Sequence, residues 1–257
     1  MKTKSILLLL LCLCGGCIYA GNGDSNKKET RPYNRLYFGF YATPAVSYRY
    51  IKENYIPIAL THDGVQTQIN HMNNNSHPEF GMRTGFKLGV NCTHWLAIES
   101  GIEYTQFRYR YDPDGFFYSN TGIGNDTFSA SYNYRYHYIS IPLALNFVMG
   151  QKRVKGIITM GTDFDFLVRE RTSYTYNYTN GITSSGALVQ DYNFNNFNLS
   201  PFFGIGADFY ITHHLILRIL PQAQMQALKN NNSYITEYLW NVGVNVSLLF
   251  GVIKAGG

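Results

Sequence analysis

The sequence is poor in charged residues and has no long hydrophobic run beyond its N-terminus. Charged residues make up 14% of the 257 positions, whereas ordinary soluble domains contain about 25%. The mean hydropathy is nevertheless only −0.18, and no run of about 18 apolar residues follows position 20. These shortages argue against an ordinary soluble enzyme and against a bundle of membrane-spanning helices.

The N-terminus has the features of an export signal. Lys2 and Lys4 precede an apolar stretch at residues 6–13, and small residues around Ala20 suit a cleavage site. We therefore predict a signal peptide at residues 1–20, a short periplasmic segment at 21–35 and one barrel domain at 36–257. Lipid attachment at Cys17 is the alternative for this region.

Strict alternation of apolar and polar residues is abundant in the rest of the chain. In residues 136–149, one face carries His137 and six apolar side chains, and the opposite face is mostly small or polar. The same period of two appears in eight segments, each long enough for the about 9–11 residues that a tilted membrane-spanning strand needs. These predicted strands are residues 37–50, 80–91, 96–109, 136–149, 156–169, 197–210, 215–227 and 237–250.

The connections between these segments alternate in length. Short links follow the second, fourth and sixth segments, and long links rich in Asn, Tyr, Ser and Gly follow the first, third and fifth. Short periplasmic turns, long extracellular loops and an even number of strands are typical of outer-membrane barrels. The fold class that we predict is all-β, an eight-stranded antiparallel transmembrane β-barrel of the cell outer membrane. A secreted soluble sandwich or a lipocalin-like carrier is the alternative.

Two adjacent segments carry opposite charges on the side that would face the barrel interior. Arg83 and Glu103 are equidistant from Thr93 in the sequence, and so are Lys87 and Glu99. A hairpin centred on Thr93 therefore predicts that Arg83 lies directly opposite Glu103, and Lys87 directly opposite Glu99.

A third pair is expected between the sixth and seventh segments. Asp208 and Arg218 flank a turn near His213 and have the same inward parity. Further interior charges are expected at Asp163, Asp165 and Arg49. Because side chains fill the interior of an eight-stranded barrel, these charges predict a paired polar plug and no open pore.

The strand motifs resemble those of a known family. The run YISIPLALNF at residues 138–147, GFKLGVN, IESGIEYTQF and the closing WNVGVNVSLLF are similar to those of the small outer-membrane β-barrel proteins of the Bacteroidetes, often labelled PorT-like. The resemblance implies an integral outer-membrane barrel, and one relative is associated with type IX secretion and gliding. An accessory barrel of a secretion machinery is therefore one alternative function.

Residues for catalysis are sparse. His137 and Ser140 differ in parity, so a regular strand places them on opposite faces and prevents a dyad. After the predicted signal peptide the sequence has no CxxC, no HExxH and no phosphate-binding glycine loop. We expect a protein that is not an enzyme, without catalytic residues or cofactors. The alternative is a lipid-modifying barrel enzyme that uses interior carboxylates such as Glu99 and Asp163.

The long loops suggest recognition. Residues 116–138 and 174–194 interleave aromatic residues with Asn, Ser, Thr and Gly, which combine contact area with adaptable hydrogen bonding. The candidate recognition residues are Tyr174, Tyr176, Tyr178 and Tyr192. Tyrosines that merely form the aromatic girdle at the membrane surface are the alternative. We expect outer-membrane lipids and an extracellular or secretion-machinery protein as partners, and the net charge of +5 gives no support to nucleic acid.

The first long loop contains weak candidates for a metal site. His62, His71 and His77 lie there, with Asp63 beside the first. Imidazole and carboxylate groups are ligands that Zn²⁺ and Cu²⁺ accept. Their spacing matches no standard ligand pattern, so we expect no bound metal.

Overall fold

The computed structural model describes residues 36–55, 61–115, 117–119, 126–150, 153–188, 194–212, 214–231 and 233–252. The predicted signal peptide and the segment up to residue 35 lie outside these ranges. In chain order the elements are β1 (Leu36–Glu53), α2 (His62–Asn74), β2 (Ser76–Asn91), β3 (Leu96–Tyr111), β4 (Phe117–Ser119), β5 (Asp126–Met149), β6 (Val154–Tyr178), β7 (Thr183–Leu188), β8 (Phe197–Tyr210), β9 (Leu215–Met225) and β10 (Ile235–Val252).

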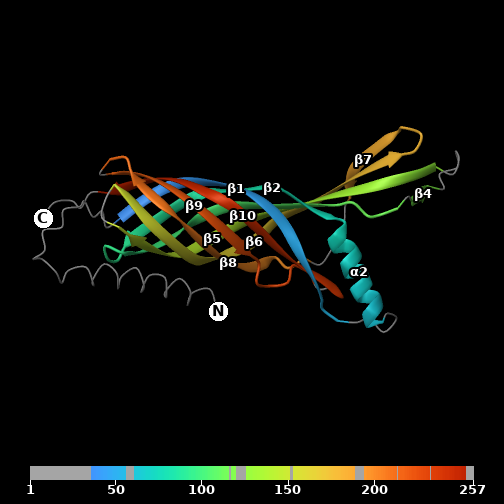
Figure 1. Cartoon of the computed structure of the whole chain (residues 1–257), viewed down its shortest axis with the longest axis horizontal. Coiled ribbons are helices and arrows are strands. Elements are labelled where there is room, and N and C mark those ends of the chain that lie inside the picture. Colours follow the sequence, from blue (N-terminus) through green and yellow to red (C-terminus); the bar gives the residue numbers. More distant parts are fainter. Residues whose placement is uncertain are drawn as a thin grey trace, which may run out of the picture.

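The long strands close into a barrel. The sheet order is β4-β5-β3-β2-β1-β10-β9-β8-β6-β7, and a further pairing joins β5 to β6. This pairing closes a ring of eight antiparallel strands, while β4 and β7 attach to the sheet beyond the ring. All eight predicted strands are present, and the predicted fold class is confirmed (Figure 1).

Alternation along each strand separates an apolar outside from a polar inside. The burial pattern of β1 changes at nearly every residue, because successive side chains of a strand point to opposite faces. Outward apolar side chains are widely exposed, as in Phe40 (60%) and Ile102 (63%). Exposed apolar residues in this number form a continuous band suited to lipid. In the part of the chain described, no helix is long and apolar enough to cross a membrane.

The two ends of the barrel differ. Short connections join β2 to β3, β5 to β6 and β8 to β9 at one end of the barrel. The first residue of β1 and the last residue of β10 lie at this same end, which we name the turn end. The opposite end, the loop end, carries α2, β4 and β7 (Figure 1). There β5 and β6, with 24 and 25 residues, continue as a hairpin well past their neighbours (Figure 1).

Two predicted loops are partly strand. Residues 116–138 and 174–194 were expected as loops, but β5 begins at Asp126 and β6 runs to Tyr178, with Phe128 paired opposite Tyr178. The polar, tyrosine-rich composition suggested a loop, whereas pairing between the two segments satisfies their backbone groups and creates strand. β4 and β7 extend the same sheet on its two sides.

The helix α2 in the first long loop was not predicted. Thr61 caps its N-terminus by accepting a hydrogen bond from the Gly64 amide at 3.2 Å. Only Val65 and Ile69 are buried, against Ile51 and Ile235 at the loop end of the barrel. Two apolar anchors on a polar helix give a weak periodic signal, and the surface that they cover exists only after the barrel has closed.

A β-bulge in β6 changes which side chains face outward. His137 pairs with Arg169 and Tyr138 with Leu167, which leaves Val168 as the extra residue. Regular alternation from Asp163 would place Arg169 on the inner face. The extra residue reverses the parity, so Arg169 is exposed and Thr172, three residues on, is buried.

Candidate functional site

The interior of the barrel holds two groups of paired charges. In the group nearer the turn end, Arg218 donates to both carboxylate oxygens of Asp208 at 2.6 and 3.0 Å and to Glu99 Oε1 at 2.5 Å. Lys87 Nζ lies 3.5 Å from Glu99 Oε2, and the Tyr37 hydroxyl donates to Glu99 Oε1 at 2.7 Å. Both carboxylate oxygens of Glu99 are therefore in contact with a positively charged side chain.

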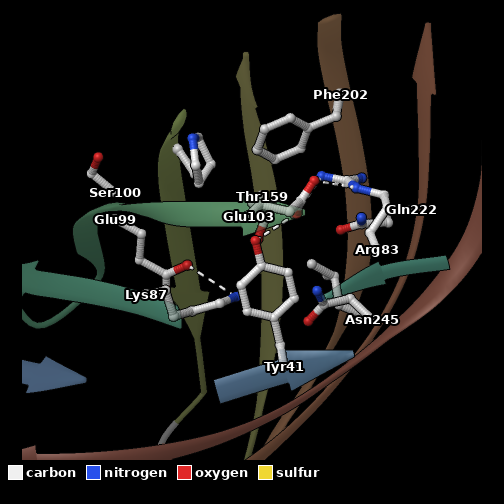
Figure 2. A pocket seen from close by; sticks show the side chains of 13 residues that line it. Tyr41, Arg83, Lys87, Glu99, Ser100, Glu103, Thr159, Phe202, Gln222 and Asn245 are labelled. Carbon is white, nitrogen blue, oxygen red and sulfur yellow. Dashed lines mark hydrogen bonds and ion pairs between the residues drawn. The ribbon is translucent and has the colours of Figure 1, made fainter. Parts of the chain in front are cut away.

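The second group centres on Arg83, closer to the loop end. Arg83 binds Glu103 through two hydrogen bonds of 2.7 and 3.0 Å and Asp163 Oδ2 through a third of 2.7 Å. The Tyr41 hydroxyl donates to Glu103 Oε2 at 2.5 Å. Figure 2 shows Tyr41, Arg83 and Glu103 converging on the lumen from different strands. Gly85 lies directly opposite Tyr41 and leaves space for the tyrosine ring. A Cβ atom at position 85 would lie only 3.1 Å from that ring.

The structure brings together all three predicted lumen pairs, but in a different register for two of them. Arg83 lies opposite Thr105, and Glu103 opposite Gly85, so the β2–β3 ladder is centred on His94 and not on Thr93. The prediction that Arg83 and Glu103 lie directly opposite each other is therefore wrong, as is that for Lys87 and Glu99. The slip is two residues, which preserves the inward face and lets long side chains meet diagonally. Asp208 and Arg218 do lie directly opposite each other.

The lumen leaves almost no free space between these groups. The cavity lined by Tyr41, Lys87 and Glu103 measures about 30 Å³, room for roughly one or two water molecules. Figure 2 shows side chains reaching into this part of the barrel from several strands. Packing of this density argues against a continuous aqueous channel through this layer.

We therefore expect little conductance. The purified protein in a planar lipid bilayer should show no steady ion current above background, because the two charge groups obstruct the lumen. Simultaneous replacement of Arg83, Glu103 and Asp163 by glycine should open a measurable path if the barrel still inserts. Large, steady currents from the unaltered protein would contradict the filled lumen and favour a porin.

The histidines predicted as weak metal candidates lie apart. His62 Nδ1 is 3.0 Å from Glu53 Oε2, whereas His77 Nε2 is 3.5 Å from Asp112 Oδ2 and His71 Nδ1 is 3.9 Å from Asp114 Oδ2. Each imidazole thus has a different carboxylate neighbour. Within the described ranges, no three metal-ligating side chains gather in one place.

A pocket of about 300 Å³ opens at the loop end, at the mouth of the barrel. Such a volume suits a small ligand or one unit of a chain. At its base Arg49, 4% exposed, lies 3.3 Å from Glu237 Oε2, and its guanidinium group is 4.4 Å from the Tyr109 ring centroid. Tyr109 and Tyr136 donate to the two oxygens of Glu237 at 2.9 and 2.8 Å. The mouth pocket is therefore polar, aromatic and balanced in charge.

Arg49 retains one binding group that no side chain uses. Its Nε is buried and has no hydrogen-bond partner among the described residues, although its other nitrogens bind Tyr109 at 3.1 Å and Ser76 at 2.9 Å. A buried donor without a partner costs free energy. A ligand oxygen or an ordered water in the mouth pocket would satisfy it.

Glu170 adds a titrating group next to the mouth pocket. It lies opposite Tyr136, accepts a hydrogen bond from Thr172 at 3.2 Å, and is about half buried. Burial, with a further contribution from the negative charge of Glu237, raises the pKa of the Glu170 carboxyl to about 7.

The pKa shift of Glu170 predicts a pH-dependent stability of this region. An acid whose pKa is raised in the folded state binds its proton more tightly there, so ionisation between about pH 5 and pH 7 destabilises the fold. Stability should therefore fall as the pH rises through this window, and Glu170→Gln should remove the effect. Hydrogen exchange of β6 at pH 5 and pH 8 measures it, and an identical pH response in both proteins would contradict the assignment.

Aromatic side chains continue from the mouth pocket onto the β5–β6 hairpin. Ring centroids lie 4.7 Å apart for Tyr109 and Tyr134, 6.4 Å for Tyr132 and Tyr176, and 4.7 Å for Phe128 and Tyr176. Their common side is the continuation of the inner barrel face, because β5 residues of even number face inward. We call this the aromatic face, made of Phe128, Tyr132, Tyr134, Tyr174, Tyr176 and Tyr178.

The predicted recognition residues fall partly on this face. Tyr174, Tyr176 and Tyr178 belong to β6 and are partly exposed, so they lie on a strand and not on the expected loop. Tyr192 lies outside the described residues. Tyr132, Tyr134 and Phe128 were not among the predicted residues, although their alternation with Ser and Asn in residues 128–134 was a strand signal.

Comparison with known proteins agrees with this architecture. The family described as "Outer membrane protein beta-barrel domain" matches residues 60–224. The chain belongs to this family. This outer-membrane β-barrel protein matches no protein of curated function.

Solved structures similar to this outer-membrane barrel are small barrels of low sequence identity. OprG from Pseudomonas aeruginosa is 9% identical, with 88% of this chain and 100% of that chain covered and a TM-score of 0.41. Neisserial surface protein A is 12% identical, with 82% and 96% covered and a TM-score of 0.36. Ail, the attachment invasion locus protein of Yersinia pestis, is 11% identical, with 82% and 97% covered and a TM-score of 0.29.

Proposed function

We propose that this outer-membrane barrel is a surface-binding protein whose barrel is a non-catalytic scaffold. The observation that carries the proposal is the aromatic face, which leads from the mouth pocket onto a hairpin that projects beyond the barrel (Figure 1). In barrels of this kind the longer loops are extracellular, so the projecting hairpin belongs to the cell exterior. A rigid strand pair is better suited than a mobile loop to hold several rings in one orientation.

The chemistry of the site favours a neutral, hydroxyl-rich chain such as an oligosaccharide. Sugar rings have apolar faces that pack on tyrosine rings, and hydroxyl groups that bond to polar side chains. Arg49 and Glu237 neutralise each other at the base of the mouth pocket, so no net charge selects a strongly ionic ligand. The rim provides amide and hydroxyl groups from Gln68, Asn231 and Ser233.

The test is binding of the purified, detergent-solubilised protein to an array of neutral oligosaccharides. Retention of at least one class in the micromolar range or tighter is the expected result. An array without any retained oligosaccharide, for protein that migrates as a folded barrel, would count against this ligand class.

Two other roles remain as alternatives to surface binding. A PorT-like accessory role in secretion would require a protein partner at the same exposed hairpin, and co-purification with secretion components from intact envelopes would favour it. A lipid-modifying enzyme would require a nucleophile and a base together. Ser140 faces Asp165 at 2.5 Å inside the barrel, whereas His137 is hydrogen-bonded to Tyr104 on the outer surface, which favours the non-catalytic proposal.

A further inference from the structure

Arginines form a row on the outer surface of three adjacent strands. Arg108 on β3 lies directly opposite Arg135 on β5, and Arg135 lies directly opposite Arg171 on β6. Arg169, opposite His137, adds a fourth positive charge one step closer to the turn end. Side chains in direct register across an antiparallel ladder are about 4.5–5.5 Å apart at Cβ, and like charges at that separation repel.

The row lies where the lipid-facing band ends. On β5 the outward side chains are apolar from Met149 to Ile139, and the next two outward residues are His137 and Arg135. On β6 the apolar side chains reach Phe166 and Val168, both exposed, before Arg169. The band on β5 has the length of about 9–11 residues that a membrane-spanning strand needs. The arginines are thus at the level of the outer-leaflet headgroups.

The protein itself neutralises little of this charge. Among the described residues, Glu79 forms an ion pair with Arg108 at 3.0 Å, and none forms one with Arg135, Arg169 or Arg171. The Nε atoms of Arg108 and Arg135 are shielded from solvent, and neither has a hydrogen-bond partner within the described ranges.

The β6 bulge creates the row. If β6 continued in regular register, with Val168 opposite His137, Arg169 and Arg171 would face the interior and Glu170 would face outward opposite Arg135. The bulge thus removes a carboxylate from the outer surface and replaces it with two guanidinium groups. A feature that concentrates like charges lowers stability unless an external anion binds there.

We propose that Arg135, Arg169 and Arg171 bind the phosphate group of an outer-leaflet lipid. Guanidinium groups bind phosphate through paired hydrogen bonds, and clusters of basic side chains at a membrane surface recognise anionic headgroups. The exposed Ile139 and Phe166 directly below offer an apolar surface for the acyl chains of the same lipid. This site is separate from the mouth pocket and the aromatic face, so its test is independent of the proposed surface binding.

Native mass spectrometry of the full barrel in a non-ionic detergent tests the site. The probes are a phosphorylated lipid A, the same lipid after removal of its phosphates, and inorganic phosphate. We expect the phosphorylated lipid to bind at least about tenfold more tightly than the dephosphorylated one. Equal binding of the two lipids, or displacement of the lipid by inorganic phosphate of similar affinity, would overturn the assignment to a lipid headgroup.

Variants locate the binding to the row. Arg135→Gln combined with Arg171→Gln should lower the affinity for the phosphorylated lipid at least about tenfold. The control is Lys52→Gln, which removes an exposed positive charge from β1 near the loop end and should leave binding unchanged. If the affinity of the double variant were within twofold of that of the unaltered protein, the arginines would be excluded as the lipid-binding site.

Thermal unfolding separates lipid binding from a purely structural role. Without lipid, Arg135→Gln should raise the midpoint of unfolding, because it relieves repulsion from Arg108 and Arg171. With phosphorylated lipid, the unaltered protein should gain more stability than the variant. A variant that is less stable both with and without lipid would assign Arg135 a structural role and reject the proposal.

Discussion

Arg83→Ala is expected to lower the free energy of unfolding by about 3–5 kcal/mol, the usual cost of removing one partner from a buried ion pair. Arg83 is 3% exposed and donates three hydrogen bonds, two to Glu103 and one to Asp163. Its removal leaves two carboxylates without their cation in the closed interior. Urea unfolding in lipid vesicles, followed by tryptophan fluorescence and heat-modifiable gel migration, measures the change.

The matched control removes the charges together. Arg83→Met with Glu103→Leu is expected to recover only part of the loss, because Asp163 still lacks its cation. Adding Asp163→Asn should recover most of the lost stability. Gln224 donates a hydrogen bond of 2.7 Å to Asp163 in the unaltered protein, and the asparagine amide can still accept it. A single variant within about 1 kcal/mol of the unaltered protein would show that the lumen network is not a major source of stability.

Replacing three rings of the aromatic face is expected to weaken surface binding strongly while leaving the barrel intact. Phe128→Thr, Tyr132→Thr and Tyr176→Thr together should lower affinity for any oligosaccharide retained by the unaltered protein by at least about tenfold, because aromatic side chains dominate such interfaces. Threonine has a high strand propensity, so the β5–β6 hairpin should persist. All three positions lie beyond the lipid-facing band, and insertion should be unaffected.

The same hairpin supplies a control for this prediction. Asn133 and Ser173 lie opposite each other on the other face of β5 and β6, and their joint replacement by alanine should leave binding unchanged. Equal loss in both variants would indicate a general disturbance of the hairpin. Unchanged binding in the threonine variant would remove the aromatic face as the recognition surface.

Local patterns in the sequence predict most of the barrel architecture. Alternation is a property of neighbouring residues, so the eight strands and the inward face of Arg83, Glu99 and Asp208 could be predicted without knowledge of the fold. The register of β2 and β3 was wrong by two residues, because the turn after Asn91 has no strong signal for its centre. The parity survived, since a slip of two residues returns each side chain to the same face.

The order of residues along the chain was enough to predict which segments cross the membrane, which side of each strand is polar, and which charges are available in the lumen. The contacts across the ring, such as that between Arg83 and Asp163, could not be predicted in this way, because ring closure joins strands that are distant in the sequence. The outward arginine row and the aromatic face also arise from the pairing of β5 with β6. One extra residue in β6 reverses a parity, and two segments that look like loops become strand only by pairing with each other.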